Sequence, residues 1–218
     1  MRRIQNCPWS LLIALSVSLG PALPALAQSA QEISQEAIDA YLAQDYATSA
    51  EAWRRLIELE PENPDIHNSL GVTLYFLGDL EGAAAAYRQA LELDPNSPNI
   101  YNNLGVALVQ QGDIEGAIAA YRSAVDLDPT MAEVYVNLGH LLPEEEAVAA
   151  YQRATELKPD YVEAYTNLGT ILANLERYEA AIAAYEKALD LDPTLTTVAD
   201  NLETVRERFA DLADESTD

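Results

Sequence analysis

Apolar and small residues recur along most of the chain at helical spacing, in short segments separated by polar corners. Within the segment 98–111, four such residues are spaced at i, i+3, i+4 and i+7 and therefore share one face of a helix. They are Tyr101, Leu104, Gly105 and Leu108. After the corner "QQGD", a second helical face is formed by Ala117, Ala120, Tyr121 and Ala124. No segment alternates as a strand would, so the pattern predicts an all-α chain built from helix pairs.

The residues between and after these two faces suit the ends of helices. Gly112 tolerates the left-handed backbone conformation that ends a helix, and Asp113 can cap the start of the next one. Pro129 follows the second helix and cannot continue it. Small residues such as Ala117 let the paired helices approach closely, and Tyr121 fills the gap one turn later.

The pattern repeats, and three kinds of residue mark the same period. Glycines recur at intervals of 34, 34 and 30, at Gly71, Gly105, Gly139 and Gly169. Tyrosines recur at intervals of 34, 30 and 34, at Tyr87, Tyr121, Tyr151 and Tyr185. Prolines recur at intervals of 34, 34, 30 and 34, at Pro61, Pro95, Pro129, Pro159 and Pro193. A shared period with a shared loss of four residues predicts tandem copies of one helix pair.

These markers resemble the signature of the tetratricopeptide repeat (TPR) family. In the third unit the matching residues are Tyr101, Leu104, Gly105, Leu108, Ala117, Tyr121, Ala124 and Pro129. The second unit departs from the signature at His67, and the first is degenerate, although Trp53 and Pro61 keep its frame. The resemblance implies an all-α TPR solenoid, a right-handed superhelix of antiparallel helix pairs, with about five repeats and a C-terminal capping helix.

The repeat frame divides the chain into segments. We expect a secretory signal peptide in residues 1–27 and a degenerate first repeat in 28–63. The remaining segments are repeats at 64–97, 98–131, 132–161 (shortened) and 162–195, a capping helix at 196–213 and a polar tail at 214–218. In the capping helix, Leu202, Val205 and Phe209 are expected on one side and the charges on the other.

The fourth unit has lost four residues at its corner, where the sequence reads "HLLPEEEAVAAY". Four residues are close to one helical turn, so the following helix is rotated by only about 40° and its apolar face can stay in register. We expect the first helix to end near Leu142 and the second to open at Pro143, with Glu144, Glu145 and Glu146 at its positive end. The deletion is either simply tolerated, or a notch that admits a bulky partner or alters superhelical pitch.

The first residues resemble an export signal. Arg2 and Arg3 precede an apolar run, and Ala25-Leu26-Ala27 fits a cleavage site. The run from Trp9 to Leu19 is shorter than the roughly 20 residues of a membrane span, which disfavours an uncleaved anchor. Cleavage after Ala27 would leave a mature chain without cysteine and without a membrane-spanning segment, which excludes disulfides and thiolate chemistry.

The mature chain is strongly acidic. Removal of Arg2 and Arg3 from 12 basic residues leaves 10, against 36 Asp and Glu, a net charge of −26. Such a surface repels nucleic acid and anionic lipid and attracts cationic partners, although many of these acids can serve solubility alone.

Catalytic motifs are missing from the sequence. It has two histidines, His67 and His140, and no nucleophile elbow, P-loop, zinc motif or calcium loop. His67 is interpreted as a substitute for a packing aromatic residue, and His140 is expected to point toward a groove. We therefore predict no enzymatic activity, no cofactor and no metal.

By resemblance, the first helices of the units line a concave groove that binds an extended peptide or a helix. No Lys or Arg occurs in their expected ranges, 30–43, 64–77, 98–111, 132–142 and 162–175. A cationic clamp for a partner's C-terminal carboxylate is therefore disfavoured. Asp65, Glu133 and Glu163 place negative charge at the rim, which implies a neutral or basic ligand.

One Asn precedes a Leu in each of several units, with Ser69 at the equivalent place in the second unit. The row resembles the asparagine ladder by which some TPR superhelices hold a peptide main chain, because an amide both donates to and accepts from one peptide unit. Alternatively, Asn is simply the commonest residue there. The predicted peptide-binding residues are Ser69, Val72, Tyr75, Phe76, Asn103, Val106, Val109, Asn137, His140, Asn167, Thr170 and Asn201.

The sequence thus favours a non-catalytic protein–protein interaction scaffold or assembly factor that works outside the cytoplasm. A bacterial periplasm fits best, and a thylakoid lumen or secretion would give the same signal. Two alternatives stay open. The chain can be an accessory subunit that regulates an envelope enzyme through its convex face, or a self-associating structural protein. The partner and the oligomeric state are left open.

Overall fold

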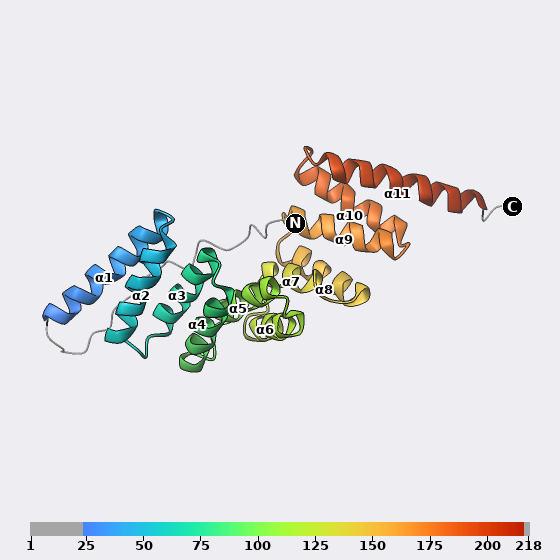
Figure 1. The fold of residues 1–218 in the computed structure, drawn as a ribbon. Helices are drawn as coiled ribbons and strands as arrows, with labels where there is room; N and C mark the ends of the chain where they lie inside the picture. The colour runs from blue at the N-terminus through green and yellow to red at the C-terminus, as the bar shows by residue number, and fades with distance from the viewer. Residues whose placement is uncertain (1–23, 216–218) are drawn as a thin grey trace. The chain divides into compact units, whose positions relative to one another are not determined.

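The computed structural model describes residues 24–215, and within them the side chains of residues 29–212. This part of the chain forms helices and no strand, which confirms the all-α prediction (Figure 1). The helices are α1 (Pro24–Leu42), α2 (Tyr46–Leu59), α3 (Pro64–Leu77), α4 (Leu80–Leu93), α5 (Pro98–Gln111), α6 (Ile114–Leu127), α7 (Ala132–Gly139), α8 (Glu144–Leu157), α9 (Val162–Asn174), α10 (Tyr178–Leu191) and α11 (Thr196–Glu215). None of these helices is long and apolar enough to cross a membrane.

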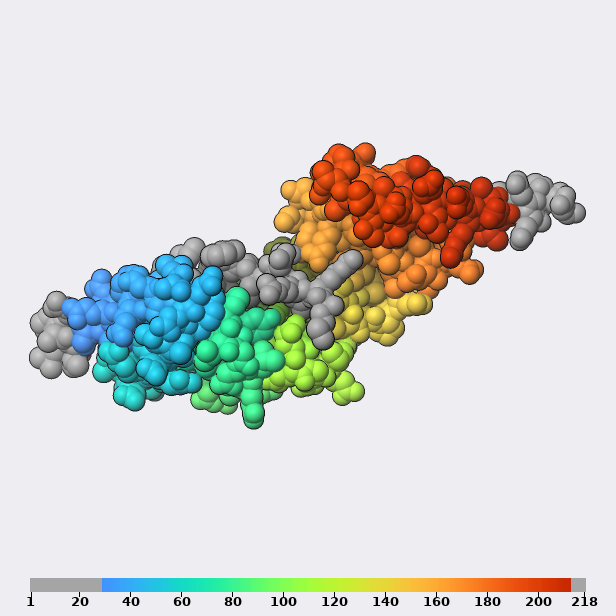
Figure 2. Space-filling model, turned by 45° about the horizontal axis from the view of Figure 1, so that its top comes forward, coloured from blue at the N-terminus to red at the C-terminus, as the bar shows by residue number. Residues whose placement is uncertain are grey.

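The chain divides into two compact units, which we call the N-terminal unit (Met1–Leu127) and the C-terminal unit (Asp128–Asp218). In the N-terminal unit, α1 pairs with α2, α3 with α4 and α5 with α6, and each pair packs on the next. Figure 2 shows the surfaces of α1 to α4, coloured blue to green, joined without a break. In the C-terminal unit, α7 pairs with α8 and α9 with α10, and α11 packs on α10.

One contact recurs in every pair that follows the repeat signature. A glycine of the first helix lies under the tyrosine ring of the second, at Gly71–Tyr87, Gly105–Tyr121, Gly139–Tyr151 and Gly169–Tyr185. A Cβ atom on Gly105 would lie 2.5 Å from a ring carbon of Tyr121, which is 1% exposed. The tyrosine therefore occupies the space that any other residue would need, and only glycine lets the two helices approach this closely.

The corners between paired helices form as the sequence predicts. Gly112 ends α5 with a φ of 85°, and the carboxylate of Asp113 accepts a hydrogen bond of 2.9 Å from the amide of Gly116 in the first turn of α6. Gly78 and Asp79 repeat the arrangement between α3 and α4, with a φ of 89° and a bond of 2.9 Å to Gly82. These side chains satisfy an amide that the first helical turn leaves without an intrahelical partner.

The loss of four residues falls on the first helix of the fourth unit. Helix α7 has 8 residues, whereas α8 keeps the 14 residues of the other second helices. The expectation that α7 reaches Leu142 is wrong, since α7 ends at Gly139. Leu141 and Leu142 instead both donate to the carbonyl of Leu138, forming a tight turn before Pro143. Glu145 also pairs with Arg177 at 2.8 Å, so the acidic triplet is more than a helix start.

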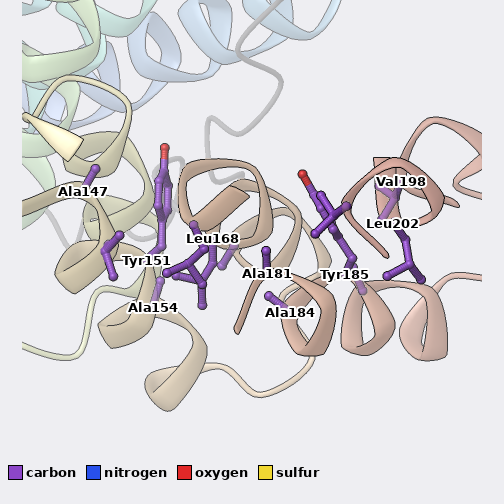
Figure 3. Close-up of a cluster of buried hydrophobic side chains, with 14 of the residues drawn as sticks. Ala147, Tyr151, Ala154, Leu168, Ala181, Ala184, Tyr185, Val198 and Leu202 are labelled. Carbon is purple, nitrogen blue, oxygen red and sulfur yellow. The ribbon is translucent and has the colours of Figure 1, made fainter. Parts of the chain in front are cut away.

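The core of the C-terminal unit runs from Val136 of α7 to Val205 of α11, and Figure 3 shows part of it, including Ala147, Tyr151 and Leu202. Val198, Leu202 and Val205 of α11 are buried in it, as expected for a capping helix. Phe209, expected on the same side, borders a hollow beside Tyr178 of α10 but is 44% exposed. The pairing with α10 therefore buries the apolar side of α11 over its first part only.

The predicted signal peptide lies mostly outside the described residues. Helix α1 begins at Pro24, so the expected cleavage site after Ala27 falls within its first turns. Export and cleavage stay predictions.

The Gly105–Tyr121 contact can be tested by substitution. Gly105→Ala should lower the free energy of unfolding by about 1–3 kcal/mol, because the added methyl group meets a buried ring. In an open helical site the same change would stabilise the helix by about 1 kcal/mol. Urea unfolding followed by circular dichroism measures the difference.

The matched control places Gly105→Ala in a Tyr121→Leu background, where the ring is absent. There the alanine should cost less or become favourable, which a double-mutant cycle will show. Stabilisation by Gly105→Ala in the otherwise unchanged chain would contradict the assigned role of the contact.

Candidate functional site

The face of the first helices in the N-terminal unit is partly closed. Ser69, Val72 and Val109 are partly exposed, whereas Asn103 and Val106 are 2% and 5% exposed. The hydroxyl of Ser69 donates to the carbonyl of Asp65 at 2.8 Å, within its own helix. Ser69, Val72 and Val109 reach the surface of α3 and α5 and the other two do not, so these residues do not form a row of open polar groups.

Asn103 ties two first helices together. Its Nδ2 atom donates to Oδ1 of Asn68 at 3.1 Å, and both side chains are buried. Its Oδ1 atom is buried and lacks a hydrogen-bond partner within the part of the chain that the structure describes. Asn103 therefore joins α3 to α5, and in this conformation it does not present an accessible amide to a peptide.

The amides of the C-terminal unit are more accessible. Asn137, Asn167 and Asn201 are all partly exposed, on α7, α9 and α11. Nδ2 of Asn167 lies 3.0 Å from Nε2 of His140, so one predicted site residue contacts another. Thr170 is exposed, donates to the carbonyl of Thr166 and accepts a bond of 3.1 Å from the hydroxyl of Tyr185.

His140 occupies the shortened corner, directly after α7. Its ring meets that of Tyr151 edge-to-face, with centroids 5.9 Å apart, and its Nε2 atom meets Asn167. Because Nδ2 of Asn167 is a donor, Nε2 of His140 must accept, which requires the neutral imidazole with its proton on Nδ1.

Electrostatics agree with a neutral His140. Loss of hydration against the packed ring lowers its pKa from the ordinary value, while the negative charge of Glu163 opposes that change. Burial and the same Glu163 charge together raise the pKa of Tyr151 well above its ordinary value. The corner therefore presents a neutral imidazole and a neutral phenol beside one carboxylate.

Within each unit the first helices, whose exposed side we call the first-helix face of that unit, carry acids and no bases. Helices α1, α3, α5, α7 and α9 contain no Lys or Arg, and Asp65, Glu133 and Glu163 stand in the first turns of three of them. The basic side chains are on the second helices, on α11 and in connections, where some form ion pairs. Examples are Arg55–Glu36 at 3.0 Å and Arg206–Glu186 at 2.6 Å.

Tyr75 and Phe76 belong to a different feature. Their rings are 5.5 Å apart, and the ring of Phe76 also meets those of Tyr41 and Tyr46, at 5.8 Å and 5.6 Å. The sequence interpretation missed Tyr41 and Tyr46. The repeat period could have identified Tyr41, because Tyr41 precedes Tyr75 by one full repeat.

Within residues 24–215, no three His, Cys, Asp or Glu side chains converge in a way that could hold a metal ion. The chemistry that the first-helix face offers consists of amide and hydroxyl hydrogen bonding, carboxylate charge and apolar contact.

Sequence models of one family cover most of the chain. A model described as "TPR repeat" matches residues 39–78, 73–112, 107–142 and 145–176. A model described as "Tetratricopeptide repeat" matches residues 162–195. No curated protein sequence matches the chain significantly.

Solved structures of similar fold share little sequence with the chain. A crystal structure of the MamA protein is 21% identical, with a TM-score of 0.70 over 78% of this chain and 96% of that one. YrrB, described as a TPR protein with an unusual peptide-binding site, is 20% identical, with a TM-score of 0.67 over 81% and 96%. PilF of Pseudomonas aeruginosa is 17% identical, with a TM-score of 0.68 over 86% and 93%.

The lowered pKa of His140 predicts how stability depends on pH. As pH falls through the ordinary pKa of about 6.5, the unfolded chain takes up the proton before the folded chain does. The free energy of unfolding should therefore decrease below that pH and be unaffected by this group above it. Thermal unfolding of the wild type and of His140→Gln across this range gives the measurement, since the variant lacks this contribution.

Glu163→Gln supplies the matched test of the cause. The substitution removes the negative charge that works against the lowered pKa of His140. That pKa should therefore fall further, as measured by NMR titration of the imidazole carbons. A His67→Gln variant identifies the His140 signals. A pKa of His140 above the ordinary value would contradict the neutral imidazole.

Proposed function

The chain belongs to the tetratricopeptide repeat family, and we propose that it holds a neutral or basic peptide segment or helix against the first helices of its repeats. The family and the fold of the similar structures support a role in protein–protein interaction in general. In this proposal the chain is a non-catalytic scaffold or assembly factor.

The observation that carries this proposal is the one-sided charge of the first helices within each unit. Across α1, α3, α5, α7 and α9, acids occur without a single cation. A partner with negative charge would be repelled, whereas a basic segment would be attracted and steered toward this face. A free C-terminal carboxylate finds no cation to receive it. A neutral or basic internal segment is the ligand that this face suits.

Main-chain recognition would come from the amides. Asn137, Asn167 and Asn201 are the partly exposed members of the row, and an amide can bond a peptide unit whatever side chain that unit carries. Val72 and Val109 add partly exposed apolar contacts in the N-terminal unit. The buried Asn103 serves the packing of α3 on α5, so it has no direct part in this proposal. The structurally similar protein YrrB, described as having an unusual peptide-binding site, supports the proposal that this chain binds a peptide.

We place this activity outside the cytoplasm, and in a bacterial periplasm first. The basis is the sequence of residues 1–27, whose basic start, short apolar run and small residues suit an export signal. The high negative charge also suits a protein that works in solution.

Self-association is a second candidate, and one observation favours it. Phe209 and Leu212 of α11 are 44% and 48% exposed, and with Tyr178 and Ala180 they border a hollow of about 570 Å³. A second copy could place an apolar side chain there. Light scattering at increasing concentration, with Phe209→Ser as the comparison, distinguishes this function from capture of a different protein.

The proposed function can be tested with defined peptides. Fluorescent pools of short peptides with basic, neutral or acidic composition are titrated with residues 28–218 and followed by anisotropy. The basic pool should bind best, and its affinity should fall with added salt. The variant Asp65→Lys/Glu133→Lys/Glu163→Lys should weaken its binding by about tenfold or more, since it reverses the charge of the face.

The control is Glu115→Lys/Glu144→Lys/Glu179→Lys, which changes the net charge equally in the first turns of three second helices. It should retain most of the binding. Equal loss in both variants would show that only net charge matters. The amides are tested by an Asn137→Ala/Asn167→Ala/Asn201→Ala variant. If it binds every pool as well as the wild type, the amides do not contribute to peptide binding.

A further inference from the structure

Four aromatic rings contact one another in the N-terminal unit, at the turns from α1 to α2 and from α3 to α4. Figure 1 shows these two turns at the same edge of the unit. The rings of Tyr46 and Phe76 are stacked, with centroids 5.6 Å apart, and Tyr41 meets both edge-to-face, at 5.5 Å and 5.8 Å. Tyr75 adds a further edge contact to Phe76. We call these four residues, with Leu42 and Leu77, the aromatic corner.

The aromatic corner leaves a large apolar area in water. Leu42 is 60% exposed, Leu77 is 45% exposed and Phe76 is 41% exposed. The three Tyr rings are each partly exposed. Exposed apolar side chains close to one another in a fold favour contact with another molecule, because their hydration is unfavourable.

The fold does not require aromatic residues at this place. The turn from α5 to α6 has the same glycine end and the same aspartate cap, yet Gln110 and Gln111 replace Phe76 and Leu77. Gln111 donates to the carbonyl of Leu80, so this turn has polar side chains at these two positions and is still well formed. The turn therefore does not by itself explain why aromatic rings occur at this place.

The charges around the aromatic corner have one sign. Asp45 and Asp79 cap α2 and α4, Asp45 directly before Tyr46 and Asp79 three residues after Phe76, and Asp39 stands in the last turn of α1. Their hydrogen-bond donors are neutral: Gln35 for Asp39, Thr48 for Asp45 and the Gly82 amide for Asp79. The first cation of the described chain is Arg54, two turns into α2.

Local hydrogen bonds favour the charged form of Asp45. Hydrogen bonds from the side chain and the backbone of Thr48 lower the pKa of Asp45. The carboxylates of Asp45 and Asp79 cap the helices that follow the two turns where the rings gather. A surface with both groups favours a cation, by charge and by the attraction of a cation to an aromatic ring.

We propose that the aromatic corner anchors a partner segment in which an Arg or Lys side chain stands next to an aromatic or large aliphatic one. The cation meets the ring faces and the aspartates, and the apolar side chain packs on Phe76, Leu42 and Leu77. The proposal rests on the proposed function for the basic nature of the partner, but its residues lie at the helix turns and not on the amide row. The two sites can therefore be tested apart.

The variant that tests the aromatic corner is Phe76→Gln/Leu77→Gln, which copies Gln110 and Gln111 of the equivalent turn and should fold normally. The probes are three synthetic peptides of equal length: one with alternating Arg and Phe or Leu, one with the apolar residues changed to Ser, and one with the Arg residues changed to Glu. Anisotropy titration gives their affinities. The Arg–apolar peptide should bind the wild type at least about tenfold more tightly than either of the others.

In the variant that preference should fall by about tenfold, with unchanged circular dichroism. Leu93→Gln is the matched control, because Leu93 is 40% exposed at the end of α4 away from the turn, and it should bind as the wild type does. Equal binding of the Arg–apolar and Arg–Ser peptides, or equal binding by wild type and variant, would overturn the proposal.

The two sites can fail independently. Loss of binding only in Asp65→Lys/Glu133→Lys/Glu163→Lys would retain the proposed function and remove the aromatic corner. Loss only in Phe76→Gln/Leu77→Gln would retain the corner and remove the first-helix face. If the wild type self-associates in sedimentation and Phe76→Gln/Leu77→Gln does not, the corner contacts a second copy, and the anchor for a basic partner is overturned.

Discussion

The contact between a glycine backbone and a tyrosine ring determines the geometry of each helix pair. It occurs at Gly71, Gly105, Gly139 and Gly169, each under a buried tyrosine of the following helix. The missing Cβ sets how closely the helices approach, and the ring fills the remaining space without a void. Because the pairs thereby acquire similar geometry, they can stack, and the first helices keep a surface for other contacts.

The fourth repeat shows which part of the unit is dispensable. It has lost the end of its first helix, yet Gly139 still lies under Tyr151 and α8 keeps its full length. The deletion instead places His140 at the end of a shortened helix, where its ring reaches Tyr151 and Asn167. A change that leaves the core contact intact has thus altered the accessible surface of the C-terminal unit.

Charged residues differ between first and second helices, and aromatic residues differ between repeats. First helices carry acids and amides without cations, while the cations that form ion pairs are on second helices and α11 or near them. The first two repeats place aromatic residues at their turns, whereas the third places glutamines there. Repeats with one backbone therefore offer different chemistry, because positions outside the Gly–Tyr contact are free to vary.

The sequence by itself determined the helix pairs, their turns and the sign of the surface charge. Periodicity and caps are local properties, so Gly112 and Asp113 could be assigned from their neighbours alone. Only the tertiary structure decided that Asn103 is buried on Asn68, that Tyr41 and Tyr46 meet Phe76, and that α11 leaves Phe209 exposed. These facts depend on how one pair packs against the next, since Asn68 and Asn103, like His140 and Asn167, belong to different repeats. A repeat signature specifies the inside of a pair, whereas exposure is decided by side chains that neighbouring pairs contribute.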